Sequence, residues 1–521
     1  MQNQDDHRTD HRPDHRPDYS LTFVLAAIAA FFLARLPLLS HRLFDPDEFQ
    51  HSHAAWCVFK GMVPYRDFFE HHTPWYYYAL SPFFRGFNVE GSFESARHFL
   101  TFARGLSLAL TVVSVAIVVL MGRLLADRKA GLLAGLMLVG QPVFLQKTVE
   151  IRPDVLALPF YLGGLWFLLR GLERTTTAAR SLRDFLVGGL GLGAAIMCTQ
   201  KMLFVLPGAL AGLGLWFLLG GRGRDGAGPH TRVVRILAFG IGGAIPAVCT
   251  WALFASHHAG GLFITNNFLV NAKWNYVVHE QLLLLLETTW PILLLAGLGA
   301  TVAVYRWIQS GQRGYGEILL LCTLAGLIAG ILVVPVAHRQ YYLMALPMIC
   351  LFAAKGLGVL LDCAKERARS WLLVLGVMAL SVLPVLGLRD AYAERNDHQL
   401  ARLRQVIETT SATDVVMDGW EGTGVFRPHA FHHYFLHDEA LAMIPRAQVD
   451  ALLDNLESGR LRPKLIALDE QLVALGSRFL KFIRRNYESR DGFFYYVKAY
   501  APESVSRPAS RRPESATTSA P

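Results

Sequence analysis

Two clusters of acidic and imidazole side chains lie close together near the start of the sequence. The first is Phe44-Asp-Pro-Asp-Glu-Phe-Gln-His, and the second is Asp67-Phe-Phe-Glu-His-His, followed by the aromatic run Trp75-Tyr-Tyr-Tyr. A positioned carboxylate can remove the proton of a hydroxyl nucleophile, and carboxylates together with histidine can hold a divalent cation. The two clusters therefore indicate base catalysis, a metal site, or both.

The first cluster also has the pattern of a helix start. Asp45 suits the N-cap, Pro46 the first helical position, and Glu48 the third position of a capping box. His51 would then follow Asp47 by one helical turn. The candidate ligands for a divalent ion, Mg²⁺, Mn²⁺ or Zn²⁺, are Asp47, Glu70 and His51. Metal-assisted and metal-free chemistry both remain open.

The composition places these clusters in a membrane protein. The 521 residues are 53% hydrophobic and 17% charged, which is typical of a helical bundle dissolved in lipid. About eleven stretches are long and apolar enough to span a bilayer. They begin near Leu21, Phe99, Ala130, Val155, Phe185, Met202, Val233, Leu285, Ile318, Tyr341 and Trp371. We expect an α-helical polytopic membrane protein.

The basic residues define an orientation rather than a nucleic-acid surface. The net charge is +9, but many Lys and Arg residues lie in short loops between apolar stretches, where they orient membrane proteins. With a cytoplasmic N-terminus they fall on the inner side, as in the loops near 123–129, 170–183, 222–235, 306–313 and 365–369. Residues 42–96, 256–284 and everything after 388 then lie outside. Nucleic acid is therefore excluded as a partner, and both acidic clusters belong to the first outer loop.

The chain is predicted to have four parts. Residues 1–19 form a disordered cytoplasmic tail, 20–389 the transmembrane domain with its catalytic outer loop 42–96, 390–501 an extracytoplasmic α/β domain, and 502–521 a disordered tail. The strand-like runs Asp414-Val-Val-Met and Lys464-Leu-Ile-Ala-Leu alternate with helical stretches near Leu400 and Val449, which is the pattern of βα units.

The first loop resembles that of the GT-C superfamily of integral-membrane glycosyltransferases. Pro46-Asp-Glu, followed by Phe69-Glu70, is similar to motifs of the bacterial lipid A aminoarabinose transferases and the protein O-mannosyltransferases. The resemblance implies the GT-C fold, a catalytic aspartate at Asp47 with Glu48 as its neighbour, and a second acidic position at Glu70 that organises the site or touches a metal. The aminoarabinose transferases usually have lysine where this chain has His71.

Weaker matches concern the donor phosphate. Thr199-Gln-Lys201 and the segment His338-Arg-Gln-Tyr-Tyr-Leu resemble family segments that meet the donor. The expected phosphate-binding residues are Lys201, Arg339, Arg152 and Tyr342. Two simpler interpretations remain: Lys201 could extend to the membrane interface as an ordinary lysine, and Arg152 could form an ion pair with Asp154.

The resemblance implies an inverting transfer of a sugar from a polyprenyl-phosphate donor to an envelope acceptor, which could be lipid A or its core, a polysaccharide or a protein. The expected location is the outer face of a bacterial inner membrane, among membrane lipids. The alternative is a secondary transporter of an amphipathic or anionic substrate. Transporters usually carry charges in mid-membrane on broken helices and have related halves, whereas no internal repeat is visible in this sequence.

Two further segments have candidate roles. His429, His433 and His437 would share one face if their segment were helical, where they could bind a metal or simply cover the membrane domain. The segment 263–278, with Asn266, Asn267, Asn271 and Trp274, is predicted to be an interfacial helix that gates acceptor access.

Overall fold

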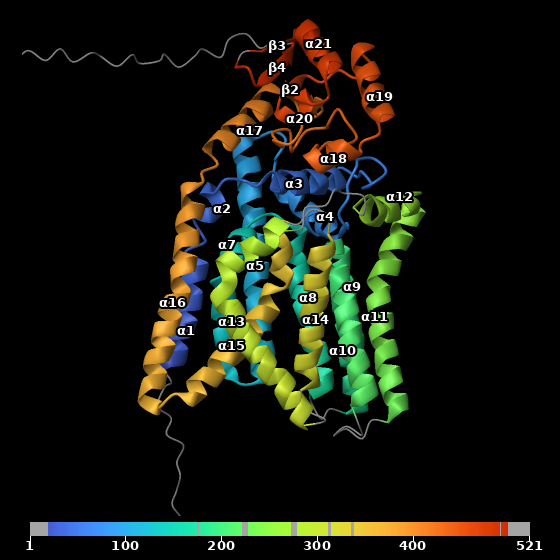
Figure 1. Cartoon of the computed structure of the whole chain (residues 1–521). Helices are drawn as coiled ribbons and strands as arrows, with labels where there is room; N and C mark the ends of the chain where they lie inside the picture. Colours follow the sequence, from blue (N-terminus) through green and yellow to red (C-terminus); the bar gives the residue numbers. More distant parts are fainter. Residues whose placement is uncertain are drawn as a thin grey trace, which may run out of the picture. The chain divides into compact units, whose positions relative to one another are not determined.

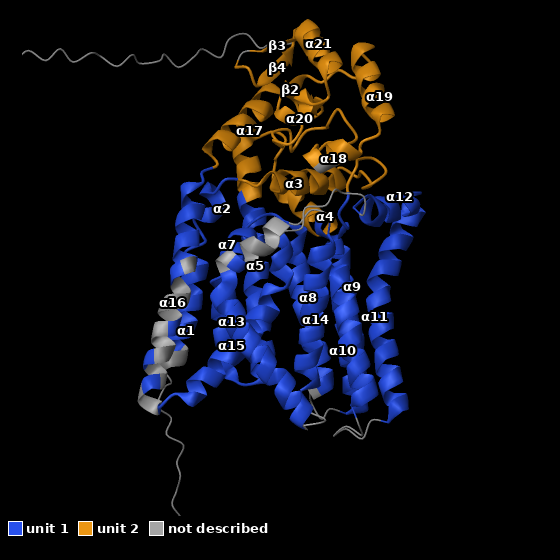
Figure 2. Ribbon diagram, in the orientation of Figure 1, with its two compact units in different colours: residues 1–43, 71–76, 101–395 blue, residues 44–70, 77–100, 396–521 orange. Residues whose placement is uncertain are grey.

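The computed structural model describes residues 19–173, 177–220, 228–271, 279–310, 314–334, 338–489 and 491–498. The chain forms two compact units (Figures 1 and 2). The helical unit comprises Met1–Leu43, His71–Tyr76 and Thr101–Arg395, and the mixed unit comprises Phe44–Glu70, Tyr77–Leu100 and Asn396–Pro521. The predicted tails, 1–19 and 502–521, lie outside the described residues except for Tyr19, which begins the first helix.

The helical unit consists of long helices joined by short turns. Its elements are α1 (Tyr19–Leu33), α2 (Leu38–His41), most of α5 (Phe93–Leu125), α6 (Arg128–Val139), α7 (Pro142–Lys147), α8 (Pro153–Glu173), α9 (Ala178–Cys198), η2 (Gln200–Phe204), α10 (Val205–Leu219), α11 (Pro229–Ser256), α12 (Gly260–Ile264), η3 (Thr265–Val270), α13 (His279–Ser310), α14 (Tyr315–Val333), η5 (Arg339–Met344), α15 (Leu346–Cys363) and α16 (Glu366–Ala393).

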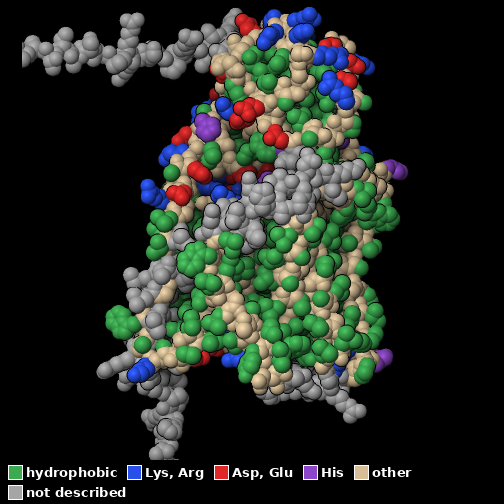
Figure 3. All heavy atoms as spheres, viewed as in Figure 1, with side chains coloured by type: hydrophobic (Ala, Val, Ile, Leu, Met, Phe, Trp, Pro, Cys, Tyr) green, Lys and Arg blue, Asp and Glu red, His purple; other side chains and the backbone are tan. Residues whose placement is uncertain are grey.

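Nine helices in the described part are long and apolar enough to cross a membrane, which confirms the polytopic helical class. Hydrophobic side chains cover most of the described surface of the helical unit on the face shown in Figure 3. Two of the eleven predicted spans are not among the nine. The stretch near Ala130 is divided into α6 and α7, because Pro142 holds the preceding Gln141 in extended geometry. The stretch near Trp371 forms α16, a helix of 28 residues.

Close packing of small residues joins α8, α9 and α11. A Cβ atom on Gly191 of α9 would lie 2.7 Å from the carbonyl oxygen of Phe160 in α8, and one on Gly189 would lie 2.1 Å from that of Phe239 in α11. Such contacts let helix backbones approach closely in lipid. Arg152 directly precedes α8, and Lys201 lies in η2, shortly after α9.

The mixed unit combines part of the first loop with the C-terminal residues. Its elements are α3 (Pro46–Phe59), most of α4 (Trp75–Leu80), η1 (Ser81–Gly86), α17 (Asp397–Thr409), β1 (Val416–Met417), α18 (Asp438–Met443), α19 (Arg446–Glu457), β2 (Leu465–Ala467), α20 (Glu470–Val473), α21 (Ser477–Asn486), β3 (Tyr487–Ser489) and β4 (Phe494–Val497). The first residues of α5, up to Leu100, also belong to it.

The four strands form one small sheet in the order β1-β2-β4-β3. β1 pairs with β2 in parallel, with Val416 opposite Leu465, while β4 is antiparallel to both β2 and β3. Leu452 of α19, Ile466 of β2 and Phe479 of α21 share one buried cluster. The two predicted strands and their flanking helices are therefore confirmed.

The first loop packs with the C-terminal residues inside the mixed unit. The backbone N–H of Phe44 donates to Oε1 of Gln399 at 2.7 Å, and Nε2 of Gln399 donates to the Phe44 carbonyl at 2.9 Å. Gly422 has a φ of +68°, and a Cβ atom there would lie 2.4 Å from Cβ of Phe49. This turn requires glycine both for its backbone conformation and for the space beside α3.

Candidate active site

The first acidic cluster forms the predicted helix start. The Asp45 carboxylate accepts the backbone N–H of Asp47 at 3.1 Å, and Glu48 accepts the backbone N–H of Asp45 at 3.0 Å, with Pro46 at the first position of α3. The capping interpretation of Asp45 and Glu48 is confirmed. Glu48 is fully buried, whereas Asp47 is partly exposed and contributes only its backbone N–H to the cap.

The second acidic position lies in a buried cluster of hydrogen-bond donors. Glu70 is fully buried, and its Oε2 accepts the hydroxyl of Tyr434 at 2.9 Å. Nε2 of Gln50 lies 3.4 Å from Oε1, and the hydroxyl of Tyr77 also bonds to this carboxyl group. Burial and then the charge of Glu70 raise the pKa of both tyrosines well above the ordinary value. Both phenols therefore stay protonated and act as donors to Glu70.

Tyr77 also joins Glu70 to His51. Nδ1 of His51 lies 3.2 Å from the Tyr77 hydroxyl oxygen. An ionised carboxylate can only accept, so we assign Tyr77 as donor to Glu70 and Nδ1–H of His51 as donor to Tyr77. Nδ1 of His51 thus faces the Tyr77 phenol. Metal binding by Asp47, Glu70 and His51 stays a prediction.

The ring of His53 supports Tyr434. The two ring centroids are 4.4 Å apart, and Nδ1 of His53 lies 2.9 Å from the carbonyl oxygen of Val425. Burial lowers the pKa of His53 to about 3 and raises that of Cys57, whose Sγ is 3.4 Å from His53 Nε2. We therefore assign a neutral imidazole that donates from Nδ1 to Val425 and accepts the thiol proton at Nε2.

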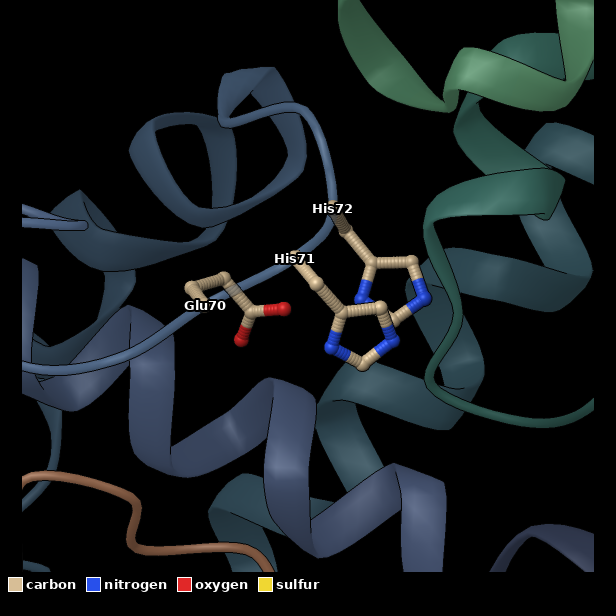
Figure 4. A group of neighbouring side chains, drawn as sticks. All are labelled: Glu70, His71 and His72. Carbon is tan, nitrogen blue, oxygen red and sulfur yellow. The ribbon is translucent and has the colours of Figure 1, made fainter. Parts of the chain in front are cut away.

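Three consecutive residues form a second candidate metal group, shown in Figure 4. One ligand atom from each of Glu70, His71 and His72 lies within 4.8 Å of the others. Among the described residues, this is the cluster of histidine and carboxylate ligands that could hold a metal ion. One oxygen and two nitrogen ligands suit zinc or manganese. The carbonyl of His71 accepts Nε2 of Gln200 and Nδ2 of Asn271, each at 2.9 Å, which fixes the backbone here.

Lys201 is held by a carboxylate in the helical unit. Its Nζ lies 3.2 Å from both oxygens of Asp154 at the start of α8, and 4.5 Å from the ring centroid of Tyr341 in η5. The arrangement differs from that of an ordinary interfacial lysine because both partners are fixed by helix ends. Tyr341, which was not predicted as a site residue, forms this contact.

Arg152 pairs with Glu150 and not with Asp154. Glu150 is fully buried and forms ion pairs with Arg152, with Nη1 of Arg42 at 3.0 Å and with Nζ of Lys147 at 3.1 Å. The alternative of an Arg152–Asp154 pair is therefore wrong: Asp154 has its own cation in Lys201. Nε of Arg42 also lies 3.8 Å from Oε2 of Glu394, so three cations share two carboxylates and the cluster has a net positive charge.

The other donor-side predictions, Arg339 and Tyr342, both lie on η5. Arg339 is exposed, whereas Tyr342 is buried in an apolar cluster with Ile331. Leu293 of α13 and Ile328 of α14 pack against the cluster that Tyr342 forms with Ile331. Phosphate binding by Arg339 and Tyr342 stays a prediction.

The histidine segment is not helical. Residues 427–437 are irregular, and His437 caps α18 by accepting the backbone N–H of Ala440 at 3.2 Å. His429, His433 and His437 therefore do not share a helix face. The other candidate segment contains α12 and η3, but residues 272–278, with Trp274, lie outside the described residues.

The sequence missed Gln50, Tyr77 and Tyr434 as partners of Glu70. Tyr434 is 364 residues from Glu70, so no local spacing could connect them. Tyr77 belongs to an aromatic run that the composition assigns equally well to packing or to the membrane interface.

Comparisons with known proteins agree on the fold. The family model "Dolichyl-phosphate-mannose-protein mannosyltransferase" matches residues 98–241. ArnT from Cupriavidus metallidurans is similar in its apo state, with 11% identity, a TM-score of 0.64 and coverage of 93% of this chain and 100% of that one. Its structure bound to undecaprenyl phosphate matches with 11% identity, a TM-score of 0.62 and coverage of 93% and 99%.

Archaeal oligosaccharyltransferase is also similar. AglB from Archaeoglobus fulgidus, in complex with an inhibitory peptide and a dolichol-phosphate, matches with 12% identity, a TM-score of 0.56 and coverage of 85% of this chain and 69% of that one. The oligosaccharyltransferase from the same organism in complex with Zn and sulfate matches with 13% identity, a TM-score of 0.55 and coverage of 84% and 67%. No curated protein sequence matches this chain.

Proposed function

We propose that this chain, which has the GT-C fold of integral-membrane glycosyltransferases, transfers a sugar from a polyprenyl-phosphate donor to an acceptor hydroxyl at the outer face of the membrane. The observation that carries the proposal is the buried Glu70 carboxylate, held by phenol and amide donors, one of them from α3, the helix with Asp47 in its first turn. A buried, fully oriented carboxylate is costly unless it is used.

The donor side of the proposal rests on cations. A sugar phosphate leaves as its negative charge is stabilised by positioned cations, and Lys201, Arg152 and Arg339 would supply this charge. The excess positive charge around Glu150 adds Arg42 and Lys147 to that side. The similar structures carry undecaprenyl phosphate or dolichol-phosphate, which supports a lipid phosphate as the carrier; Tyr342 would contact it from η5.

The acceptor side of the proposal assigns unequal roles to the acids. Asp47 would take the acceptor's hydroxyl proton while the acceptor oxygen bonds to the anomeric carbon and the bond from that carbon to the phosphate oxygen breaks. The electron pair leaves with the phosphate. Glu70 accepts hydrogen bonds from Tyr434, Gln50 and Tyr77, which use three of the about four lone-pair sites of a carboxylate, so it organises the site and does not attack. Direct displacement by one nucleophile inverts the anomeric configuration, and Glu48 supports Asp47 through the helix cap.

A divalent metal fits the residues present. Glu70, His71 and His72 would hold it, since their ligand atoms already lie within 4.8 Å of one another and offer the mixed oxygen and nitrogen set that zinc and manganese accept. Bound there, the ion would supply positive charge beside the site. The proton transfer assigned to Asp47 does not depend on it.

The test compares the envelopes of a deletion strain and of the same strain carrying the wild-type gene. Mass spectrometry of extracted glycolipids, polysaccharides and envelope proteins should show one sugar-modified species that is lost on deletion, while the polyprenyl-phosphate sugar accumulates. The acceptor would be read directly from the lost species: lipid A or core, a polysaccharide, or a protein. Identical envelopes in an expressing strain would contradict a transferase, and a changed uptake of a solute would favour a transporter.

A further inference from the structure

The carboxyl group of Glu70 lies where the first loop meets the C-terminal part of the mixed unit. The backbone N–H of Phe69 donates to the carbonyl of His432 at 2.9 Å, and the rings of Phe69 and His433 stack with centroids 4.4 Å apart. Tyr434 follows immediately and reaches Oε2 of Glu70 with its hydroxyl. Three successive residues of the C-terminal part therefore contact the two residues that end the first-loop segment.

The hydroxyl of Tyr434 is placed to act on Glu70. Its hydroxyl is 2.9 Å from Oε2 of Glu70 and 3.3 Å from the carbonyl of Gln50, so its one proton goes mainly to the carboxylate. Its ring lies 4.4 Å from that of His53 and 5.9 Å from that of Phe68, measured between centroids. The side chain is buried and its donor direction is fixed.

The loop that carries Tyr434 is anchored to the sheet. Asp469, directly after β2, accepts the backbone N–H groups of Gly419 at 2.9 Å and of Trp420 at 2.6 Å. Buried Arg427 donates to the carbonyl of Thr410 at 2.9 Å, at the end of α17. These bonds leave residues 418–437 little freedom although they lack regular structure, so the C-terminal fold determines where the Tyr434 hydroxyl lies.

We propose that Tyr434 is a positioning residue through which the C-terminal domain completes the acidic site, by holding the Glu70 carboxyl group in one orientation. The inference rests on the proposed function, in which Glu70 organises the site. It assigns the C-terminal domain a direct part in the reaction, in addition to packing.

The test uses the full-length protein in lipid vesicles and replaces the hydroxyl only. Tyr434→Phe keeps the ring contacts with His53 and removes one donor to Glu70. The matched control is Tyr487→Phe, because Tyr487 is equally buried in the same unit and donates to the carbonyl of Pro463 at 2.6 Å, away from Glu70. Infrared spectra recorded at one pH, with the Glu70→Gln spectrum subtracted, isolate the bands of the Glu70 carboxyl group without any need for turnover.

Removal of a hydrogen-bond donor changes the stretching frequency of the carboxyl group that accepted the bond. In Tyr434→Phe the Glu70 bands should therefore shift in frequency relative to wild type, and Tyr487→Phe should match wild type. The transfer rate of Tyr434→Phe should fall by about tenfold or more. Adding Tyr434→Phe to Glu70→Gln should cost nothing further.

An unchanged Glu70 band in Tyr434→Phe would overturn the inference, whatever the rates. If Tyr434→Phe does not fold, difluorotyrosine at position 434 replaces it: this residue keeps the ring and hydroxyl but is a stronger donor, so the Glu70 bands should shift in frequency relative to wild type, and no shift would count against the proposal. If wild type transfers no sugar, the proposed function fails, while the infrared spectra still decide the role of Tyr434.

Discussion

Nζ of Lys201 lies 3.2 Å from both carboxylate oxygens of Asp154. The pair joins the turn after α9 to the start of α8, so the position of the ammonium group is fixed before any substrate arrives. A cation held in this way can stabilise charge that develops on a leaving phosphate without the cost of reorganisation.

The first prediction concerns this cation. Lys201→Gln should lower kcat/KM for the lipid-linked donor by about 10- to 100-fold, because one charge-stabilising group is lost. Initial rates in vesicles over a range of donor concentrations measure it. Lys129→Gln, on the exposed start of α6, is the control and should match wild type. Equal rates for both variants would remove Lys201 from the donor site.

The second prediction concerns stability at Glu150. Glu150→Gln removes the buried carboxylate that Arg42, Lys147 and Arg152 share, and removal of one partner of a buried ion pair costs about 3–5 kcal/mol. Thermal unfolding in detergent should show a clearly lower midpoint. Glu94→Gln removes an exposed partner of Arg404 instead and should change the midpoint little. Similar midpoints for the two variants would show that the cluster does not depend on Glu150.

The third prediction concerns acid stability of the mixed unit. Burial lowers the pKa of His53 and of His433 to about 3, below the value near 6.5 of an unfolded histidine. The unfolded chain then binds more protons between about pH 3 and 6.5, so the stabilisation present above pH 6.5 is lost as pH falls, by about 1.4 kcal/mol per pH unit for each residue.

Unfolding midpoints of wild type should therefore fall steeply below pH 6.5. His433→Asn should flatten this dependence, whereas His98→Asn, at an exposed position, should retain it. A pH dependence of unfolding that is the same in all three proteins would show that His433 is not kept neutral by the fold.

How far the sequence predicts this structure depends on the range of each interaction. The capping box of Asp45 and Glu48 needs only four consecutive residues, and both partners are visible in Phe44-Asp-Pro-Asp-Glu. The two predicted strands, β1 and β2, are likewise marked by their own β-branched and apolar residues. Local patterns of this kind survive folding because their physical cause is local.

Interactions between distant segments were not accessible in the same way. Arg152 and Asp154 are two residues apart and look like a pair, but α8 begins between them and directs Asp154 to Lys201, while Arg152 bonds to Glu150. Tyr434 approaches Glu70 only because the sheet anchors its loop. Such contacts follow from packing, which a single sequence does not display.

The account depends most on Asp47 as the base. In the deletion strain, wild type and Asp67→Asn should restore the sugar-modified envelope species, since Asp67 binds Arg66 and the backbone of Val63 in the same loop and stays outside the Glu70 cluster. Asp47→Asn, expressed and inserted at the same level, should leave the species absent and the lipid-linked donor accumulated. Restoration of the species by Asp47→Asn would contradict the assignment of Asp47 as the base.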